Sequence, residues 1–178
     1  MDSNKISEEK FVIKVEEAEF VVEKSVLAER SEFFKAMFRT SESMESQKNR
    51  VIFRDISKGT MTSLVDYFHF KTIELDELDV IDILTAAHQL QILEVIQICV
   101  SFMIKKVTPD NCLLFAAVAC HLTDLQELFK PCLEKCAQNF SRIVKQEEFL
   151  LVDISLLIHL VSSEDIEDES QVVVAIET

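Results

Sequence analysis

The stretch Glu19–Phe38, EFVVEKSVLAERSEFFKAMF, changes from a strand pattern to a helix pattern across a single pair of charges. Phe20–Val22 has the aromatic and β-branched residues typical of a strand. From Val26 onward, apolar residues return at helical spacing and predict one helix that ends near Phe38. Ser25 stands directly before this helix, and we expect its hydroxyl to act as the N-cap by accepting a hydrogen bond from the first turn.

The segments on either side of this corner predict a small sheet covered by helices. Lys10–Val15 has a strand pattern, and a turn at 16–18 joins it to Phe20–Val22 in a hairpin. A polar, Ser-rich loop at 39–49 precedes a third strand at 50–56. We also expect a short edge strand at 72–75 and helices at 60–70, 76–90 and 92–107.

Pro109 marks a change of organisation, because only helical patterns follow it. We expect helices at 112–121, 124–140, 147–152 and 154–161, and the start of another at 169. The sequence therefore predicts a loose polar N-terminus over 1–9, an α+β domain over 10–107 and an all-α segment over 108–178.

The composition excludes several classes of protein. One Gly and two Pro in 178 residues are too few for the turns of an all-β protein, and no Gly-rich phosphate loop is present. A net charge of -14 disfavours nucleic-acid binding. No apolar run approaches the roughly 18 residues of a membrane span, and we expect no signal peptide, because the first ten residues contain no apolar core. An odd number of cysteines, five, favours a reducing compartment, and we expect a cytoplasmic protein with the nucleus as a second location.

The cysteines and histidines do not form a catalytic or metal-binding pattern. Cys132 and Cys136 lie four residues apart on one helix face, which is neither CxxC nor half of a zinc site. Buried helix thiols are the simpler interpretation. His88 and His159 are expected to be structural. We therefore predict no enzyme activity, no metal and no cofactor.

The order and content of these segments resemble a BTB/POZ domain followed by a partial BACK domain, as in Kelch-like proteins. The motifs that carry the resemblance are VLAERSEFFKAMF, close to the family's VLAARSPYFRAMF, together with NRVIFRDI, NCLLFAAVAC and ESQVVVAI. The resemblance extends from Phe11 to Ile176. It implies a BTB/POZ fold followed by an all-α BACK segment, without Kelch repeats in this chain. It also implies a dimerising adaptor that joins the cullin-3 ubiquitin-ligase scaffold to a substrate protein held by another domain.

The family's dimer centre holds an Asp before the first strand and a basic residue fourteen positions later. These positions are Lys10 and Lys24 here, and the usual His is Glu23. Two cations about 4 Å apart repel by about 4 kcal/mol at an effective dielectric of about 20. The sequence thus predicts a weakened dimer, unless Glu23 compensates or Lys10 points into water. The family's preceding helix, which packs across the dimer, is also expected to be missing.

The family's cullin contact contains an apolar residue, any residue and then Glu, in the loop after the first long helix. The corresponding positions are Ser43, Met44 and Glu45, with the apolar residue offset by one. The resemblance adds His69, in a helix turn, and the early BACK residues from Asn111 to Phe115. The family's YTG reads His69-Phe70-Lys71, so we expect that turn to be made differently without its Gly.

The sequence and the family resemblance leave two functional hypotheses. The first is a cullin-3 adaptor that also pairs with itself or with another BTB protein and serves an unknown substrate. The alternative is a self-association or scaffolding module, or a competitor of longer relatives, that does not bind cullin. Neither nucleic acid nor a membrane is an expected partner.

Overall fold

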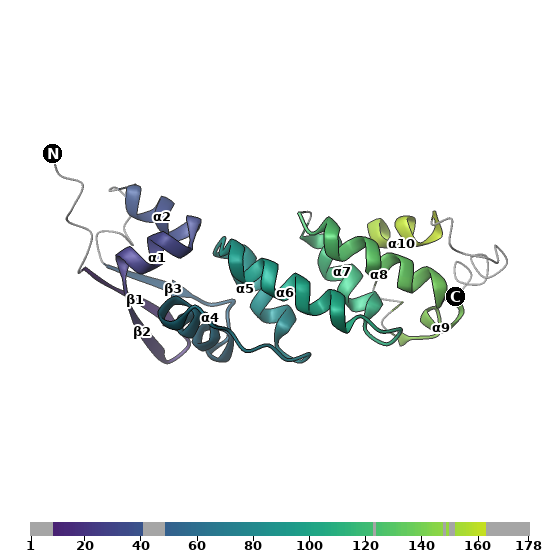
Figure 1. Ribbon diagram of the computed structural model, residues 1–178, viewed down its shortest axis with the longest axis horizontal. Coiled ribbons are helices and arrows are strands. Elements are labelled where there is room, and N and C mark those ends of the chain that lie inside the picture. The colour runs from purple at the N-terminus through teal and green to yellow at the C-terminus, as the bar shows by residue number, and fades with distance from the viewer. Residues whose placement is uncertain (1–8, 41–48, 123, 148, 150–151, 163–178) are drawn as a thin grey trace. The chain divides into compact units, whose positions relative to one another are not determined.

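The computed structural model describes residues 9–40, 49–122, 124–147, 149 and 152–162. The chain divides into two compact units, Met1–Cys99 and Val100–Thr178, and each is described here by itself. The division falls inside helix α6 (Leu93–Lys106). Figure 1 shows the strands in the first unit and helices throughout both. No helix within the described ranges is both long and apolar enough to cross a membrane.

The first unit contains a three-stranded sheet made of β1 (Lys10–Val15), β2 (Ala18–Glu23) and β3 (Arg50–Phe53). The strand order is β2-β1-β3, with β1 antiparallel to β2 and parallel to β3. The predicted hairpin is confirmed, with a shorter turn of Glu16 and Glu17. Glu16 takes a left-handed conformation at φ 51. The predicted edge strand at 72–75 is wrong, because this segment has no strand structure.

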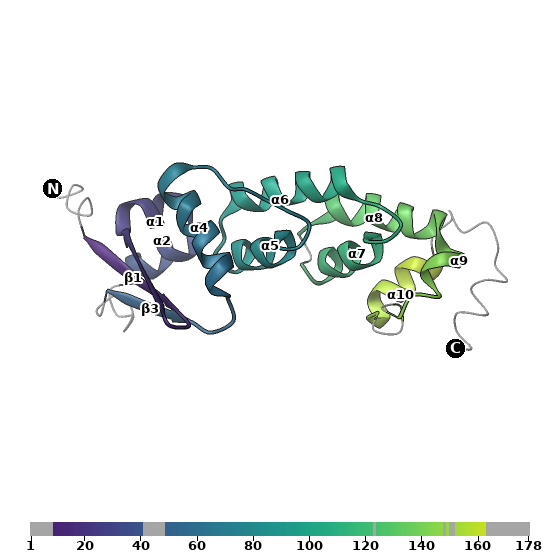
Figure 2. The same ribbon diagram turned by 90° about the horizontal axis from the view of Figure 1, so that it is seen from below.

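Helices α1 (Lys24–Arg30), α2 (Glu32–Arg39) and α4 (Lys58–Phe70) lie beside this sheet in both views (Figures 1 and 2). Helix α5 (Val80–Gln89), which packs on α4, and the start of α6 complete the unit. Phe11 and Ile13 of β1 have no exposed surface, and the Phe34 ring of α2 meets the Phe11 ring edge-on at 6.0 Å. Each such buried side chain contributes about 1.5–3 kcal/mol to folding.

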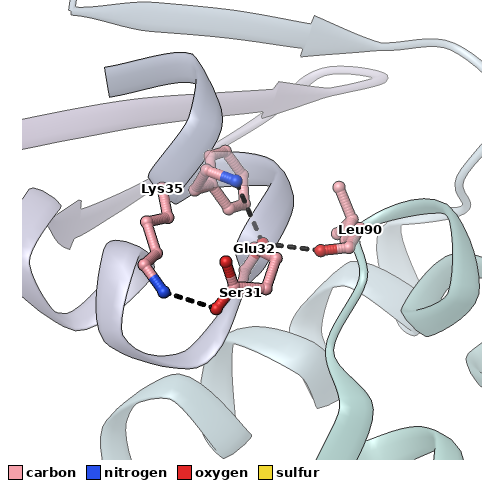
Figure 3. A network of polar contacts seen from close by, with 5 residues as sticks. Ser31, Glu32, Lys35 and Leu90 are labelled. Atoms are coloured by element: carbon pink, nitrogen blue, oxygen red, sulfur yellow. Dashed lines mark hydrogen bonds and ion pairs between the residues drawn. The ribbon is translucent and has the colours of Figure 1, made fainter. Parts of the chain in front are cut away.

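The single helix predicted from Val26 to Phe38 is wrong, because Ser31 divides it into α1 and α2. Ser31 has an extended backbone (φ -137, ψ 119), and its Oγ accepts a hydrogen bond from Phe34 N at 3.1 Å. The same hydroxyl donates to Leu90 O at 2.6 Å (Figure 3). Ser31 is therefore the N-cap of α2. The predicted cap at Ser25 is also wrong, because α1 begins at Lys24 and Ser25 already lies inside it.

The second unit is helical, with α7 (Cys112–His121), α8 (Gln126–Gln138), α9 (Phe140–Ile143) and α10 (Ile154–Val161). Helix α10 packs on both α7 and α8. The helix predicted at 147–152 is not formed among the residues described there: Glu147 and Phe149 lie in a short 3₁₀ turn, and Val152 is not helical. The helix start predicted at 169 lies outside the described residues.

Candidate interaction surfaces

A charged corner lies where β2 passes into α1, and Lys24 is its centre. This lysine is only 7 % exposed, and its Nζ lies 3.0 Å from Oε2 of Glu9. The Lys24 backbone N–H also donates to the Glu9 carbonyl at 2.9 Å. On another side the ammonium group lies over the Phe38 ring, 5.4 Å from its centroid. An acid, an aromatic face and the backbone thus hold this buried charge in place.

Glu9 is fixed by a second donor as well. Its Oε1 accepts a hydrogen bond from Asn49 Nδ2 at 2.9 Å. The hydrogen bonds from Lys24 and Asn49, together with the Lys24 charge, lower the pKa of the Glu9 carboxyl below its usual value. The prediction missed Glu9, because the family pattern places the acid at position 10, which is a lysine here.

Lys10 and Glu23, the other two residues predicted at the dimer centre, form a cross-strand pair between β1 and β2. Both are exposed, so of the possibilities left open, Lys10 points into water. The acid that compensates Lys24 is Glu9 rather than Glu23. The repulsion expected between Lys10 and Lys24 is therefore relieved by a one-residue shift of the acid.

A pocket of about 220 Å³ lies beside the end of α4 in the first unit. The Arg30 Nη1 donates to the Tyr67 and Phe68 carbonyls, the first at 2.9 Å, and covers the end of α4. The Tyr67 hydroxyl donates to Glu94 Oε2 at 2.5 Å. Burial and this acidic neighbour raise the pKa of Tyr67. The lining residues are Glu29, Arg30, Glu32, Tyr67, Lys71, Gln91, Leu93 and Glu94.

His69 and Phe70 form the exposed last turn of α4, and Phe70 is 70 % exposed. Lys71 follows at φ 57 and ψ 23, and its N–H donates to the Tyr67 carbonyl at 2.9 Å. The prediction that the turn would be made differently without Gly is wrong, because Lys71 itself takes the left-handed conformation. A side chain there costs about 1–2 kcal/mol.

The predicted BACK contacts have different environments in the second unit. Asn111 shapes the turn before α7: its Oδ1 accepts from Thr108 N at 2.7 Å, and its Nδ2 donates to Lys106 O at 3.0 Å. Phe115 is only 2 % exposed and lies in the core of the unit. The neighbouring Leu114, which the sequence reading did not single out, is 51 % exposed. The predicted cullin motif at Ser43, Met44 and Glu45 lies outside the described residues.

The cysteines are free thiols, and four of the five are buried. Burial raises the pKa of Cys132 to about 12. Cys112 donates its thiol hydrogen to Pro109 O at 3.7 Å, and a hydrogen bond with Cys136 lowers the pKa of Cys112. Across the described ranges, no group of three His, Cys, Asp or Glu side chains is placed to hold a metal ion.

Two protein families match this chain. The BTB/POZ domain family matches residues 4–107, and the BACK family (BTB And C-terminal Kelch) matches residues 112–178. The chain therefore belongs to the BTB/POZ family and continues into a BACK domain. Among curated proteins it is similar to human Kelch-like protein 6, with 31% identity over 163 residues. That match covers 90% of this chain and 26% of the relative, so the chain spans about a quarter of its length.

Two solved structures are similar to part of this chain. The BTB domain of zebrafish PATZ1 is 27% identical with a TM-score of 0.47, covering 55% of this chain and 75% of that one. The BTB domain of human Gigaxonin is 23% identical with a TM-score of 0.45, covering 52% of this chain and 75% of that one.

The predicted fold class is confirmed: a small sheet covered by helices, followed by a helical BACK segment. Domains of these two families are protein-interaction modules. The boundary at 107/108 stays a prediction, because the compact units divide after Cys99 whereas the BTB/POZ match ends at residue 107.

Proposed function

We propose that this chain is the BTB-BACK part of a cullin-3 ubiquitin-ligase adaptor, which pairs with itself or with another BTB protein. The observation that carries the proposal is the succession of a BTB/POZ and a BACK domain in one chain. The similarity to a Kelch-like protein supports it. Recognition of the substrate protein belongs to another domain in this proposal, and its site of action is the cytoplasm or the nucleus.

The proposed cullin contacts are Ser43, Met44 and Glu45, which stand between α2 and β3 in the sequence, together with His69, Asn111 and Phe115. His69 is exposed beside Phe70, so its ring is free to contact a partner. Asn111 acts by shaping the turn before α7. Phe115 acts from the core by fixing the first turn of that helix, and the exposed Leu114 beside it offers the contact surface.

The proposed dimer contact centres on Lys24, with Lys10 and Glu23 on the adjoining strand ends. The charge of Lys24 is neutralised by Glu9 of the same protomer. An acid and a base therefore stand together at this corner, as the family pattern requires, although the acid comes from a different position. This pairing supports dimerisation with a second BTB domain.

Substitution of single acids near the predicted motif Ser43, Met44 and Glu45 tests the cullin contact. The labelled N-terminal part of cullin-3 is titrated with the wild-type chain, Glu45→Ala and Glu42→Ala. Glu42 stands three positions before Glu45 in the same Ser-rich stretch of sequence and carries the same charge, so it is the matched control. Glu45→Ala should weaken binding by about tenfold or more, while Glu42→Ala should change it by less than about twofold. If both variants lost the same affinity for cullin-3, the loss would reflect the net charge of this stretch and not a specific contact of Glu45.

A second candidate is a self-association module that does not bind cullin. The exposed outer face of the sheet favours it, since Val21 and Ile52 present half or more of their surface to solvent. Binding to cullin-3 separates the two candidates, because only the first requires it.

A further inference from the structure

The outer face of the sheet carries an ordered array of charges. Alternation along the strands turns Phe11, Ile13 and Val15 toward the helices, so their neighbours face outward. The outward residues are Lys10, Val12 and Lys14 of β1, Glu19, Val21 and Glu23 of β2, and Arg50 and Ile52 of β3.

On the outer face, the charged residues of β1 are cations and those of β2 are anions. Three outward cross-strand pairs follow one another along the hairpin: Lys10–Glu23, Val12–Val21 and Lys14–Glu19. Strand β1 therefore presents a row of cation, apolar residue and cation. Strand β2 presents beside it a row of anion, apolar residue and anion.

This face is open to solvent and rich in available charge. Val21 is 51% exposed and Ile52 is 56% exposed, which is unusual for large aliphatic side chains on a sheet. Glu19 pairs with Arg50 at 2.6 Å across β1. Within the part of the chain that the structure describes, Lys10, Lys14 and Glu23 form no ion pair.

We propose that this outer face binds the same face of a second copy of the chain, related by a two-fold axis that runs along the strands between β1 and β2. Such an axis places β1 of each copy against β2 of the other. Lys10 then faces the second copy's Glu23, Val12 faces its Val21 and Lys14 faces its Glu19. A two-fold interface requires this kind of self-complementary surface.

The charges also select this axis over the alternative. A two-fold axis running across the strands would place β1 against β1, and Lys10 of one copy would then face Lys14 of the other. Glu19 would likewise face Glu23. Like charges in direct opposition are strongly disfavoured at interfaces, so the pattern specifies one orientation.

The interface is small, which sets its strength. It pairs six outward residues of β1 and β2 in each copy, whereas a stable interface uses about 20–30 residues a side. We therefore expect a weak association, with a Kd on the order of 100 µM, that becomes important when copies are already held close together. This contact shares Lys10 and Glu23 with the BTB dimer contact proposed above, but it is centred on Val12 and Val21 of the sheet face and not on the buried Lys24.

Sedimentation equilibrium of the full chain, over about 10–500 µM protein, tests the proposal. Val21→Asp places a charge at the centre of the face and should weaken the concentration-dependent association at least about tenfold. Leu78→Asp is the matched control, because Leu78 is 92% exposed but belongs to the turn before α5 and to no strand of the sheet. Folding of each variant is checked by circular dichroism. If the BTB dimer also forms, the affected step is the one from dimer to larger species.

A charge swap gives a second, independent readout. The double variant Lys14→Glu with Glu19→Lys keeps opposite charges across the two strands and leaves Arg50 an acid to pair with on β1. It should associate with itself as the wild type does, within about threefold, but not with the wild type, because like charges then meet. Association unaffected by Val21→Asp, no concentration-dependent association up to about 500 µM, or free mixing of swapped and wild-type chains would each overturn the proposal.

Discussion

Glu9 and Lys24 face each other at the open end of the β1–β2 hairpin, with 3.0 Å between carboxylate and ammonium. They occupy the position next to the Lys10–Glu23 pair, and Lys24 N–H donates to the Glu9 carbonyl. The hairpin itself therefore aligns this acid with this base. The buried lysine at this corner is therefore compensated by an acid of the same chain.

Stability should depend on the ionisation of Glu9. Its folded pKa lies below the usual 4.5, so its contribution is present above about pH 4.5 and is lost as pH falls through the lower folded value. Glu9→Gln should lower the urea midpoint at about pH 7 and have a smaller effect at about pH 3. Glu17→Gln, at the exposed hairpin turn, is the control. An equal effect of Glu9→Gln at both pH values would contradict the ion pair.

Ser31 should matter far more than Ser25. Ser31 is 1% exposed, caps α2 and donates to the Leu90 carbonyl. Ser31→Ala removes the cap and leaves a buried carbonyl without its donor, so the free energy of unfolding should fall by about 2–3 kcal/mol. Ser25→Ala, inside α1, should change it by less than about 0.5 kcal/mol. Urea unfolding measures both, and similar losses would mean that Ser31 is not the cap.

Replacing Lys71 with Gly should stabilise the protein. The left-handed conformation at φ 57 is strained for lysine and free for glycine. Lys71→Gly should raise the free energy of unfolding by about 0.5–1 kcal/mol. Lys71→Ala keeps the strain but loses the exposed contact with Glu29 at 3.8 Å, so it should be nearly neutral. Thermal unfolding compares the two variants, and a gain in Lys71→Ala as large as in Lys71→Gly would point to charge instead of backbone strain.

Tyr67 is the only tyrosine, and the chain has no tryptophan, so its ionisation can be followed directly by ultraviolet absorbance. Burial and Glu94 raise its folded pKa above the usual 10. Its stabilising effect is therefore complete below about pH 10 and is lost as pH rises toward the folded pKa. The native chain should titrate above pH 10, and the urea-unfolded chain near about pH 10. A native midpoint equal to the unfolded one would show that Tyr67 is not buried beside an acid.

Thiol reactivity should separate Cys120 from the other four cysteines. Cys120 is half-buried, while Cys99, Cys112, Cys132 and Cys136 are buried. Burial raises the pKa of both Cys99 and Cys132 to about 12. These two thiols therefore form little of the reactive thiolate at neutral pH. A disulfide reagent should label Cys120 first in the native chain and all five after unfolding. Mass spectrometry of the labelled peptides identifies the sites, and early labelling of Cys132 would contradict the packing of α7 and α8.

The sequence predicted the three strands of the sheet, their hairpin and the change to helices after Pro109, because period-two and helical patterns are strong in those segments. The predicted turn at 16–18 is one residue longer than the observed turn. A turn at 16–18 places Lys10 opposite Lys24, whereas the observed turn of Glu16 and Glu17 places Glu9 there. A one-residue change in a hairpin turn alters every pair and every facing side.

The break at Ser31 was hidden by the helical periodicity itself. Leu27 and Phe34 are seven residues apart and both fully buried, so the apolar pattern continues across the break. The available signal was the Pro that follows this Ser in the family pattern, because Pro favours the first position of a helix. Here Glu32 occupies that position and provides only a favourable charge. The environments of Phe115 and Lys71 depend on tertiary packing and backbone strain, which no local pattern records.

The claim that this chain serves a cullin-3 ligase is tested most directly by calorimetric titration of the N-terminal part of cullin-3 into the full chain. We expect saturable binding with one cullin per chain and a Kd of about 1 µM or lower. Absence of heat and of co-elution in size-exclusion chromatography, at concentrations up to about 100 µM, would contradict it and leave self-association as the function.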